Sequence, residues 1–567
     1  MRTVVTDSTP PAIASWWRWW RVLLALLAAA VIGCVAFAYR FNALGGALGG
    51  FDNDQFTVLM RTEMLFHGER PLRDFSDAGL SGAWPPLSYL LPKWAQEIGG
   101  RNLLSEAYLT VGILALAYAL VFLIALDLSR RWSMALLATA LAIATGPKLY
   151  NYSKVVSLTA GAFAIRAVAL HPTTVRLFLA AAVTAIAALF RHDYAVYVGV
   201  AMTLGLLARD PRDWRATARH IALYIGFGTI LLLPTAIAVQ MYHGIPQYLR
   251  DGLESSQIEA RRTELRWPVL HLAAPMTTDS LLALSYYLFW AVLLVAAAVM
   301  VWRLLDRGHA FPPAERATGF AVLALAGIVD LFFLRGNLGQ RFGDAIVPTV
   351  LAGAWSLGAA AALRGTRARL GLQLATPLLL AVMLVAVDIT SEVGREIETG
   401  ALTDSWEHAH GRFDRVRAEL MSLPPTDWSH VDARGTLRAA RYVAECTVPE
   451  DYVLVAAYAP EVPVFARRRF AAGQPTVGLS FYTSEADQRR AIGRLQDQSV
   501  PIILAADEAY DEEFASDYPL LASYVEAHYR LAGTIDTDRD HLRFRVFVER
   551  GRQPRRADPV LGLPCFR

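Results

Sequence analysis

Apolar stretches of about 20 residues recur along the first two thirds of the chain, and short charged connections separate them. Such stretches predict membrane-spanning helices, because each is long enough to cross the hydrocarbon core of a bilayer. Several are short, and one contains Arg166, so tilted or re-entrant segments are alternatives to full crossings there. The expected spans are residues 22–41, 104–126, 132–149, 154–170, 174–190, 193–208, 219–240, 280–302, 317–334, 345–363 and 370–388.

The pattern changes after Asp388, where charged and mixed sequence replaces the long apolar stretches. Short apolar stretches of strand length alternate there with helical patterns, which predicts a small α/β domain. Residues 389–432, which include "MSLPPTDW", are expected to be a linker or an irregular lead-in. The expected strands are 452–457, 500–506, 529–535 and 542–548, and the expected helices are 433–446 and 485–497.

The composition agrees with an integral membrane protein. Of the 567 residues, 54% are hydrophobic, a share above that of ordinary soluble domains. The net charge of +3 comes from 54 basic and 51 acidic side chains, a balance that argues against a nucleic-acid partner. We divide the chain into a transmembrane part, residues 1–390, and a second domain, residues 391–567.

Basic residues occur in alternate connections, which predicts the orientation because Lys and Arg beside spans stay cytoplasmic. With Arg18 and Arg21 inside, the N-terminus is cytoplasmic and residues 42–103 form the first outer loop. We therefore expect a polytopic α-helical protein of the plasma membrane with a C-terminal extracytoplasmic α/β domain. The expected inner connections contain Arg130, Arg131, Arg176, Arg209, Arg212, Arg215, Arg219, Arg303, Arg307, Arg316, Arg364, Arg367 and Arg369.

The N-terminal apolar stretch has a second interpretation. Residues 31–34, "VIGC", are similar to a lipoprotein cleavage site that ends at Cys34, and a basic start followed by an apolar stretch is typical of a signal sequence. The apolar stretch continues past Cys34 to full spanning length, which favours a retained helix.

The chain has three cysteines, and Cys446 and Cys565 both lie in the expected outer domain, where oxidation is permitted. We predict a disulfide between them that ties the C-terminal tail to the domain. Two unpaired thiols are the alternative, since the sequence does not show whether the two Cα atoms come within reach.

Three charged turns lie at the expected outer boundary of the membrane: "GPKLYNYSK", "FRHDYAVY" and "FLRGNLGQRFGD". Basic side chains beside tyrosines are suited to binding a phosphate at the membrane boundary. They are also typical of residues that extend to lipid headgroups, which is the alternative for any single residue. The candidate substrate-binding residues are Lys148, Tyr152, Lys154, Arg191, His192, Arg335 and Arg341.

Two acidic residues in these turns have simpler interpretations. Asp193 is expected to form an internal hydrogen-bonded pair that orients a helix end, whereas the role of His192 stays open. Asp344 follows Arg341 by three residues, a spacing that allows a local ion pair of small value.

The first outer loop contains two aspartates one residue apart, Asp52 and Asp54. A carboxylate there is a candidate general base, because an acceptor hydroxyl is a poor nucleophile until its proton is removed. A solvated turn is the alternative, since Gly49 and Gly50 precede the pair. Two carboxylates are also ligands for Mg²⁺ or Mn²⁺, so no cofactor is expected but metal dependence is left open.

The acidic pair, followed by "GERPLRDF" and "WPPLSYLLPKW" on a bundle of this size, resembles the GT-C superfamily of polyprenyl-phosphate-sugar-dependent glycosyltransferases. The resemblance covers residues 20–390 and is to the bacterial branch with an outer C-terminal domain. It implies that an aspartate of the first outer loop acts at the reaction centre.

The resemblance also implies a polyprenyl-phosphate-linked sugar as donor and an extracytoplasmic glycan, lipid or protein as acceptor. The chain departs from the family at Trp84, where relatives often have Lys before the Pro85–Pro86 pair. Lys154 and Arg191 are the candidate substitutes for that contact.

Two other classes of function compete with the enzyme. A lipid-linked saccharide flippase or transporter would use the same charged turns, but no inverted repeat or matched pair of broken helices is visible. A non-enzymatic cell-envelope assembly protein would use the outer domain alone. Because the charges gather at one face, we favour the enzyme, with residues 241–279 partly covering its site.

Overall fold

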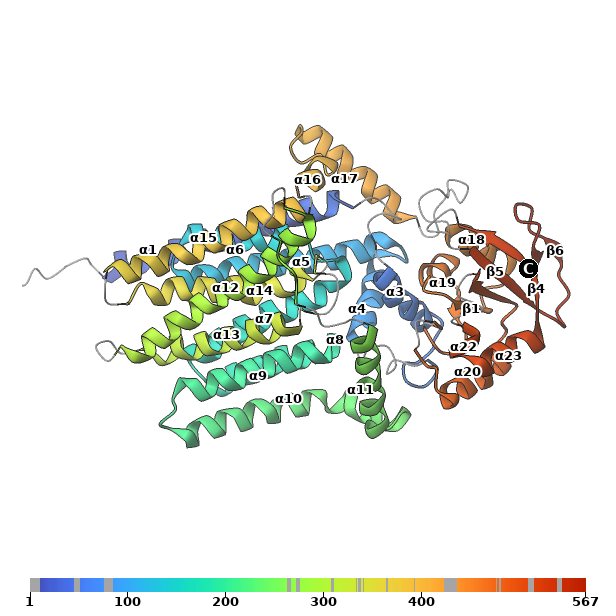
Figure 1. Cartoon of the computed structure of the whole chain (residues 1–567), viewed down its shortest axis with the longest axis horizontal. Coiled ribbons are helices and arrows are strands. Elements are labelled where there is room, and N and C mark those ends of the chain that lie inside the picture. The colour runs from blue at the N-terminus through green and yellow to red at the C-terminus, as the bar shows by residue number, and fades with distance from the viewer. Residues whose placement is uncertain are drawn as a thin grey trace, which may run out of the picture.

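The structure is a computed structural model, and it shows a long helical bundle with a smaller α/β domain beyond one end (Figure 1). The C-terminal domain lies next to the short helices that follow the first span. The described residues are 11–44, 51, 53–75, 85–262, 267–271, 276–306, 311–332, 334, 338–339, 341–363, 366–391, 393–422, 436–475, 477–478, 481–507, 514–537 and 543–567.

Every span predicted from the sequence overlaps a helix of the bundle, and the spans 132–149, 317–334 and 345–363 extend past the ends of their helices. Among the described residues, seven helices are long and apolar enough to cross a membrane, which agrees with a polytopic membrane protein, while α6 and α8 are shorter apolar helices. The bundle helices are α1 (Pro11–Asn42), α5 (Leu103–Ser129), α6 (Trp132–Ala144), α7 (Tyr152–Leu170), α8 (Thr174–Phe190), α9 (His192–Arg209), α10 (Trp214–Tyr242), α12 (Thr278–Leu305), α13 (Pro313–Phe332), α14 (Phe342–Ala360) and α15 (Thr366–Ser391).

Small residues let the bundle helices approach closely, as expected where lipid gives no hydrophobic drive for helix association. A Cβ atom at Gly358 of α14 would lie 2.1 Å from the carbonyl oxygen of Leu128 in α5. A Cβ atom at Gly319 of α13 would lie 2.3 Å from the Trp355 ring of α14. The glycines therefore fix α14 against two neighbours at the centre of the bundle.

Short helices gather at the end of the bundle nearest the C-terminal domain, which we call the domain end (Figure 1). They are α3 (Asn53–Phe66) and α4 (Leu87–Gly99), the 3-10 turn η1 (Leu149–Asn151) and α11 (Ile245–Arg262), which runs across the bundle direction. Because the bundle helices alternate in direction, the three charged turns predicted from the sequence also belong to this end.

The prediction of an irregular lead-in over residues 389–432 is wrong for its described part. The helices α16 (Val393–Thr399) and α17 (Trp406–Met421) lie there, and residues 423–435 are outside the described part of the chain. The apolar positions of α17 are few and separated by charged residues, so its pattern is weak in the sequence.

Helix α17 packs against the domain end of α1. The Arg412 guanidinium donates a hydrogen bond to the carbonyl oxygen of Asn42 over 3.1 Å. The ring of Phe413 lies 4.6 Å from that of Phe41, centroid to centroid. These contacts place α17 with the bundle, although it belongs to the stretch assigned to the second domain.

The C-terminal domain contains the predicted α/β arrangement. Its five-stranded sheet has the order β2-β1-β3-β5-β4, in which β1 is parallel to β2 and β3, while β5 is antiparallel to β3 and β4. The four predicted strands correspond to β1 (Tyr452–Ala456), β3 (Ile502–Ala506), β4 (Tyr529–Asp536) and β5 (Arg543–Glu549). The two predicted helices correspond to α18 (Thr436–Cys446) and α20 (Glu485–Asp497).

The sequence analysis did not predict six further elements of this domain, most of which are too short to show a period. These elements are α19 (Glu461–Ala466), β2 (Arg469–Phe470), α22 (Ala515–Asp517), α23 (Pro519–His528), β6 (Arg556–Ala557) and β7 (Pro564–Cys565).

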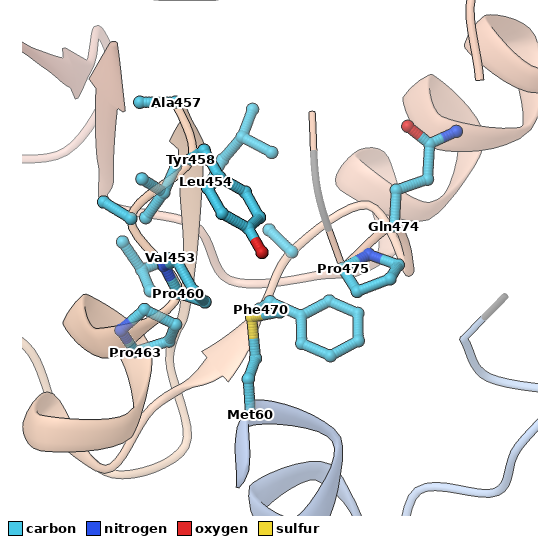
Figure 2. Close-up of a pocket in the computed structure, with 13 residues that line it drawn as sticks. Met60, Val453, Leu454, Ala457, Tyr458, Pro460, Pro463, Phe470, Gln474 and Pro475 are labelled. Carbon is cyan, nitrogen blue, oxygen red and sulfur yellow. The ribbon is translucent and has the colours of Figure 1, made fainter. Parts of the chain in front are cut away.

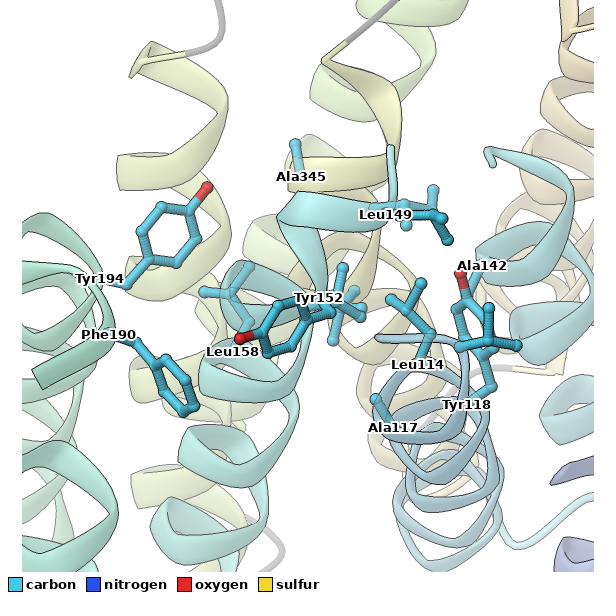
Figure 3. Close-up of a cluster of buried hydrophobic side chains, with 14 of the residues drawn as sticks. Leu114, Ala117, Tyr118, Ala142, Leu149, Tyr152, Leu158, Phe190, Tyr194 and Ala345 are labelled. Atoms are coloured by element: carbon cyan, nitrogen blue, oxygen red, sulfur yellow. The ribbon is translucent and has the colours of Figure 1, made fainter. Parts of the chain in front are cut away.

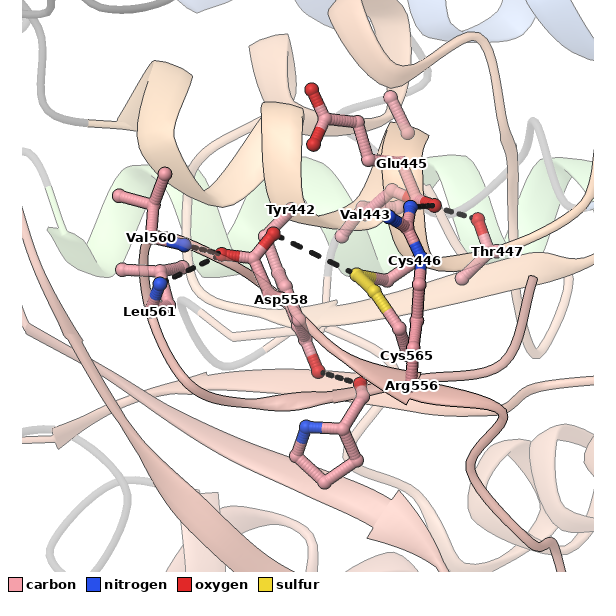
Figure 4. The surroundings of a disulfide bond; sticks show 12 residues. Tyr442, Val443, Glu445, Cys446, Thr447, Arg556, Asp558, Val560, Leu561 and Cys565 are labelled. Atoms are coloured by element: carbon pink, nitrogen blue, oxygen red, sulfur yellow. Dashed lines mark hydrogen bonds between the residues drawn. A yellow bond between two sulfur atoms is a disulfide. The ribbon is translucent and has the colours of Figure 1, made fainter.

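The predicted disulfide between Cys446 and Cys565 is confirmed, with a Cα–Cα distance of 4.3 Å (Figure 4). The buried carboxylate of Asp558 lies beside it and accepts hydrogen bonds from the Arg441 guanidinium, over 3.2 Å, and from the backbone N–H of Leu561, over 2.7 Å. The bond therefore fixes the C-terminal tail against α18 at a buried polar cluster.

Replacing both cysteines with serine is expected to destabilise the C-terminal domain by roughly 2–5 kcal/mol, because a bond that closes a long loop restricts the unfolded chain. Limited proteolysis and thermal unfolding of the full-length protein in detergent measure the loss. Cys34→Ser is the matched control, since Cys34 is exposed and unpaired. Equal stability of the two variants would contradict a structural role for the bond.

Candidate functional site

A polar pocket opens where α7, α9, α13 and α14 meet at the domain end of the bundle, and we call it the helix-end pocket. It encloses about 430 Å³ of empty space, part of it open to solvent. Its position follows from the fold, because α7, α9 and α14 begin at this end while α13 terminates there. Its lining residues are Lys154, Arg191, Asp193, Tyr194, Tyr197, Val329, Phe332, Arg341, Asp344 and Ala345.

A buried salt bridge joins two helices across the pocket. The ammonium of Lys154 in α7 donates a 2.6 Å hydrogen bond to the carboxylate of Asp344 in α14, and their side chains are 5% and 7% exposed. Asp344 therefore pairs across the bundle and not locally with Arg341. Gly343 permits this approach, since a Cβ atom there would lie 2.6 Å from Pro147.

A second ion pair orders the turn between α8 and α9. The Arg191 guanidinium donates two hydrogen bonds to the Asp193 carboxylate, over 3.1 and 3.0 Å, in the paired geometry that suits guanidinium and carboxylate groups. Its carbon lies 5.6 Å from the centroid of the Tyr194 ring. The expected internal pairing of Asp193 is thus present, with Arg191 as the partner.

His192 turns toward a different element. Its Nε2 lies 2.7 Å from the hydroxyl of Tyr248 in α11, which connects the start of α9 to the second outer segment. His192 is not among the described residues that line the pocket. The contact places α11 beside the start of α9, while no described residue of α11 lines the pocket, so a covering role of the second outer segment stays a prediction.

Arg341 differs from the other two cations of the pocket. Within the described part of the chain its guanidinium has no hydrogen-bond partner and no carboxylate within ion-pair distance, whereas Lys154 and Arg191 each bind a carboxylate. With three cationic and two anionic side chains, the lining carries a net positive charge. An anion that entered the pocket would therefore find a guanidinium available to bind it.

One wall of the pocket is apolar. Val329 and Phe332 come from the last turns of α13, and the Tyr197 ring stacks on Phe332 with centroids 5.2 Å apart. Cations on one side and a hydrocarbon wall on the other suit an anionic group that is attached to an apolar chain.

Two predicted residues lie near the pocket but do not line it. Tyr152 is buried in the apolar cluster of Figure 3, where its ring lies 5.9 Å from that of Phe190. Its hydroxyl has no hydrogen-bond partner among the described residues. The ammonium of Lys148 lies 6.0 Å from the centroid of the Tyr150 ring. Asp52, Trp84, Arg335 and Asn337 are outside the described residues.

Asp54 lies in the first turn of α3, where the positive end of the helix dipole favours a carboxylate. It is not in a solvated turn, because the hydroxyl of Tyr458, in the loop between β1 and α19, donates a hydrogen bond to its Oδ1. Since 404 residues separate the two positions, no sequence signal pointed to Tyr458.

A chain of contacts connects α3 to the helix-end pocket. Gln55, next to Asp54, donates a hydrogen bond to Glu106 in the first turn of α5, and both side chains are fully buried. Helix α3 also contacts η1, the turn that leads directly into α7. The candidate base and the cationic pocket therefore belong to one packed region.

The C-terminal domain makes further contacts with the first outer segment. Glu69 accepts a 2.5 Å hydrogen bond from the hydroxyl of Tyr452 and a 3.2 Å hydrogen bond from the guanidinium of Arg469. Burial, followed by the bond to the Glu69 carboxylate, raises the pKa of Tyr452 to about 12. Tyr452 thus remains a hydrogen-bond donor at neutral pH.

One group of side chains in the described part of the chain has the spacing of a metal site: Cys446, Asp558 and Cys565. The two thiols are joined in the disulfide, and Asp558 is bound to Arg441 and to backbone N–H groups. These residues therefore form a structural cluster.

Comparisons with known proteins add little to this geometry. No protein-family model matches the chain, and no curated protein matches it either. Solved structures similar to it include the crystal structure of ArnT from Cupriavidus metallidurans bound to undecaprenyl phosphate, at 17% identity and a TM-score of 0.48. The alignment covers 93% of this chain and 97% of that chain. A likeness of this degree carries no argument about activity, so the assignment of the site rests on its own contacts.

Asp344→Asn is expected to destabilise the bundle by about 3–5 kcal/mol, because it leaves the buried Lys154 ammonium without its counter-charge. Thermal unfolding in detergent measures the effect. The double variant Lys154→Met, Asp344→Leu is the matched control, since removing both charges leaves none unpaired and is expected to restore most of the stability. An Asp344→Asn protein as stable as the unmodified chain would contradict this account.

Proposed function

We propose that the chain is a membrane glycosyltransferase that moves a sugar from a polyprenyl-phosphate donor to an extracytoplasmic acceptor. The helix-end pocket carries the proposal. The Arg341 guanidinium and the charges of Lys154 and Arg191 bind the phosphate, while the wall formed by Val329 and Phe332 accepts the start of the polyprenyl chain.

Two observations support an extracytoplasmic position for the site. The described basic residues of the expected cytoplasmic connections belong to the opposite end of the bundle, as they would if that end faced the cytoplasm. The domain beyond the site contains a disulfide, which is typical of an oxidising compartment. In this orientation the N-terminus is cytoplasmic and the enzyme lies in the plasma membrane.

In the proposed reaction the Asp54 carboxylate takes the proton of an acceptor hydroxyl while the hydroxyl oxygen attacks the anomeric carbon of the donor. The bond between that carbon and the phosphate oxygen breaks, and the polyprenyl phosphate leaves with the electron pair. This single displacement inverts the anomeric centre. The cations of the helix-end pocket stabilise the negative charge that develops on the phosphate.

In the proposed reaction, side chains stabilise the negative charge on the phosphate, and no step uses a metal ion. The net positive charge of the pocket, which Arg341 supplies, can offset part of the charge of a phosphate, which is the role that Mg²⁺ has in many phosphate sites. Turnover is therefore expected to continue in EDTA. Loss of activity in EDTA that Mg²⁺ or Mn²⁺ restores would show that a metal takes part.

The assay uses purified full-length protein in detergent, with radiolabelled polyprenyl-phosphate hexoses and pentoses as donors. Neutral octyl glycosides, octyl glucuronide and a cell-envelope extract serve as acceptors. Transfer in detergent distinguishes an enzyme from a flippase, because a micelle has no second compartment into which a substrate could move. Absence of transfer from every donor would contradict the proposed function.

Asp54→Asn is expected to lower kcat by about 10²-fold to 10⁴-fold, because the amide cannot accept the proton of the acceptor hydroxyl. Asp52→Asn is measured beside it, since the two carboxylates are neighbours in the sequence. Binding of undecaprenyl phosphate is expected to stay unchanged in both variants. Full turnover by both would place the base elsewhere.

Arg341→Ala is expected to weaken binding of undecaprenyl phosphate roughly 10-fold to 100-fold, the range for losing a hydrogen bond to a charged group. Affinity is measured by titration of the protein in nanodiscs. Arg212→Ala is the matched control, because Arg212 is exposed in the turn between α9 and α10, at the opposite end of the bundle. Equal affinities of the two variants would remove Arg341 from the site.

A further inference from the structure

The C-terminal domain reaches the candidate base through a packed interface with α3. The ring of Phe465 in α19 lies 5.2 Å from that of Phe56 in α3, and Phe470 in β2 lies 5.7 Å from Phe75. Tyr458, which precedes α19 in the chain, donates its hydrogen bond to Asp54 in α3. The interface therefore holds the phenol in one position relative to the carboxylate.

A groove lies on the other side of Tyr458, between α3 and the edge of the sheet (Figure 2). It encloses about 320 Å³ of empty space, part of it open to solvent. Met60 forms its floor, and Figure 2 shows the Tyr458 hydroxyl directed into the space above Met60 and Phe470. None of the described residues that line the groove is charged.

The groove has one polar side chain besides Tyr458. Gln474 is 6% exposed, and its Oε1 has no hydrogen-bond partner among the described residues, while its amide N–H donates to the carbonyl of Asp487 over 3.3 Å. A buried carbonyl oxygen without a donor is suited to bind a ligand hydroxyl. Apolar walls from prolines and Phe470 are suited to the C–H face of a sugar ring.

Tyr458 connects the groove to the proposed chemistry. A general base must be oriented toward the hydroxyl that it deprotonates, and small displacements are costly. A carboxylate has about four acceptor positions, so a hydrogen bond from Tyr458 orients Asp54 and leaves it able to accept a proton. Asp54 is not among the described residues that line the groove, so the Tyr458 side chain, which lines the groove and donates to Asp54, is the connection between the two.

We propose that the C-terminal domain completes the catalytic centre: Tyr458 positions Asp54, and the groove beside Tyr458 receives the neutral, hydroxyl-bearing part of a glycan acceptor. The inference rests on the proposed function and adds the class of acceptor to it. The anionic donor and the neutral acceptor thus occupy separate sites, the first cationic and the second uncharged.

Tyr458→Phe is expected to lower kcat about 10-fold, the effect of one hydrogen bond to a charged group, with the KM of the donor and the affinity for undecaprenyl phosphate unchanged. Tyr452→Phe is the matched control: it removes a hydrogen bond from the same domain to the same outer segment, at Glu69 and not at Asp54. It is expected to leave kcat unchanged. If Tyr458 only holds the domain in place, the two variants will behave alike, which overturns the inference.

A double-mutant cycle gives a second readout. If Tyr458 acts through Asp54, Tyr458→Phe has no further effect on kcat in the Asp54→Asn protein. Independent effects of the two substitutions would overturn the inference. An active enzyme that Tyr458→Phe does not slow overturns the inference alone, whereas a protein without transfer from any donor overturns the proposed function as well.

The groove has its own test with octyl glycosides. Neutral octyl glycosides are expected to accept the radiolabelled sugar or to compete with the acceptor in the cell-envelope extract, and octyl glucuronide is expected to do neither. Gln474→Ala is expected to raise their KM or inhibition constant about 10-fold at unchanged kcat for the extract. Preference for the glucuronide, or failure of every neutral glycoside to bind, overturns the assignment of the groove.

Discussion

The salt bridge between Lys154 and Asp344 is the interaction on which the domain end of the bundle depends. Two opposite charges at the ends of α7 and α14 are held away from solvent, and each is stable there only in the presence of the other. Because α7 and α14 lie at the centre of the bundle, this pair fixes the position at which α9 and α13 close the pocket. The Lys154–Asp344 pair also sets part of the charge balance of the pocket, because it neutralises one of the three cations.

The charge balance of the pocket explains how the folded protein is stable without a bound ligand and can still bind an anion there. Two of its cations are neutralised by carboxylates that the fold supplies, so the folded protein does not contain a cluster of unpaired positive charge. Arg341, which is partly exposed to solvent, adds the net positive charge. A phosphate would therefore exchange contacts with water for contacts with Arg341 while the structural pairs stay in place.

The C-terminal domain is integrated with the bundle through the first outer segment. Asp54 and Glu69 each accept a hydrogen bond from a tyrosine of that domain, and aromatic rings pack between these polar contacts. Such an interface, with apolar contacts around a few directed hydrogen bonds, fixes geometry more than it adds stability. Through these contacts the C-terminal domain reaches the helix that contains Asp54.

The sequence alone determined the helical stretches of the bundle and the main strands of the sheet, and it predicted the pairing of Cys446 with Cys565 with two unpaired thiols as the alternative, because each depends on local periodicity or on a small number of possible partners. It also indicated Lys154, Arg191 and Arg341 as pocket residues from their places at helix ends. The sequence did not predict helix α17, since that helix has few apolar positions within a charged stretch.

Only the tertiary structure decided which residues pair: Asp344 is 190 residues from Lys154, and Tyr458 is 404 residues from Asp54. Contacts at such separations depend on how whole helices and domains pack. Many residues of the core determine that packing together, so the two residues in contact do not by themselves reveal that they are partners.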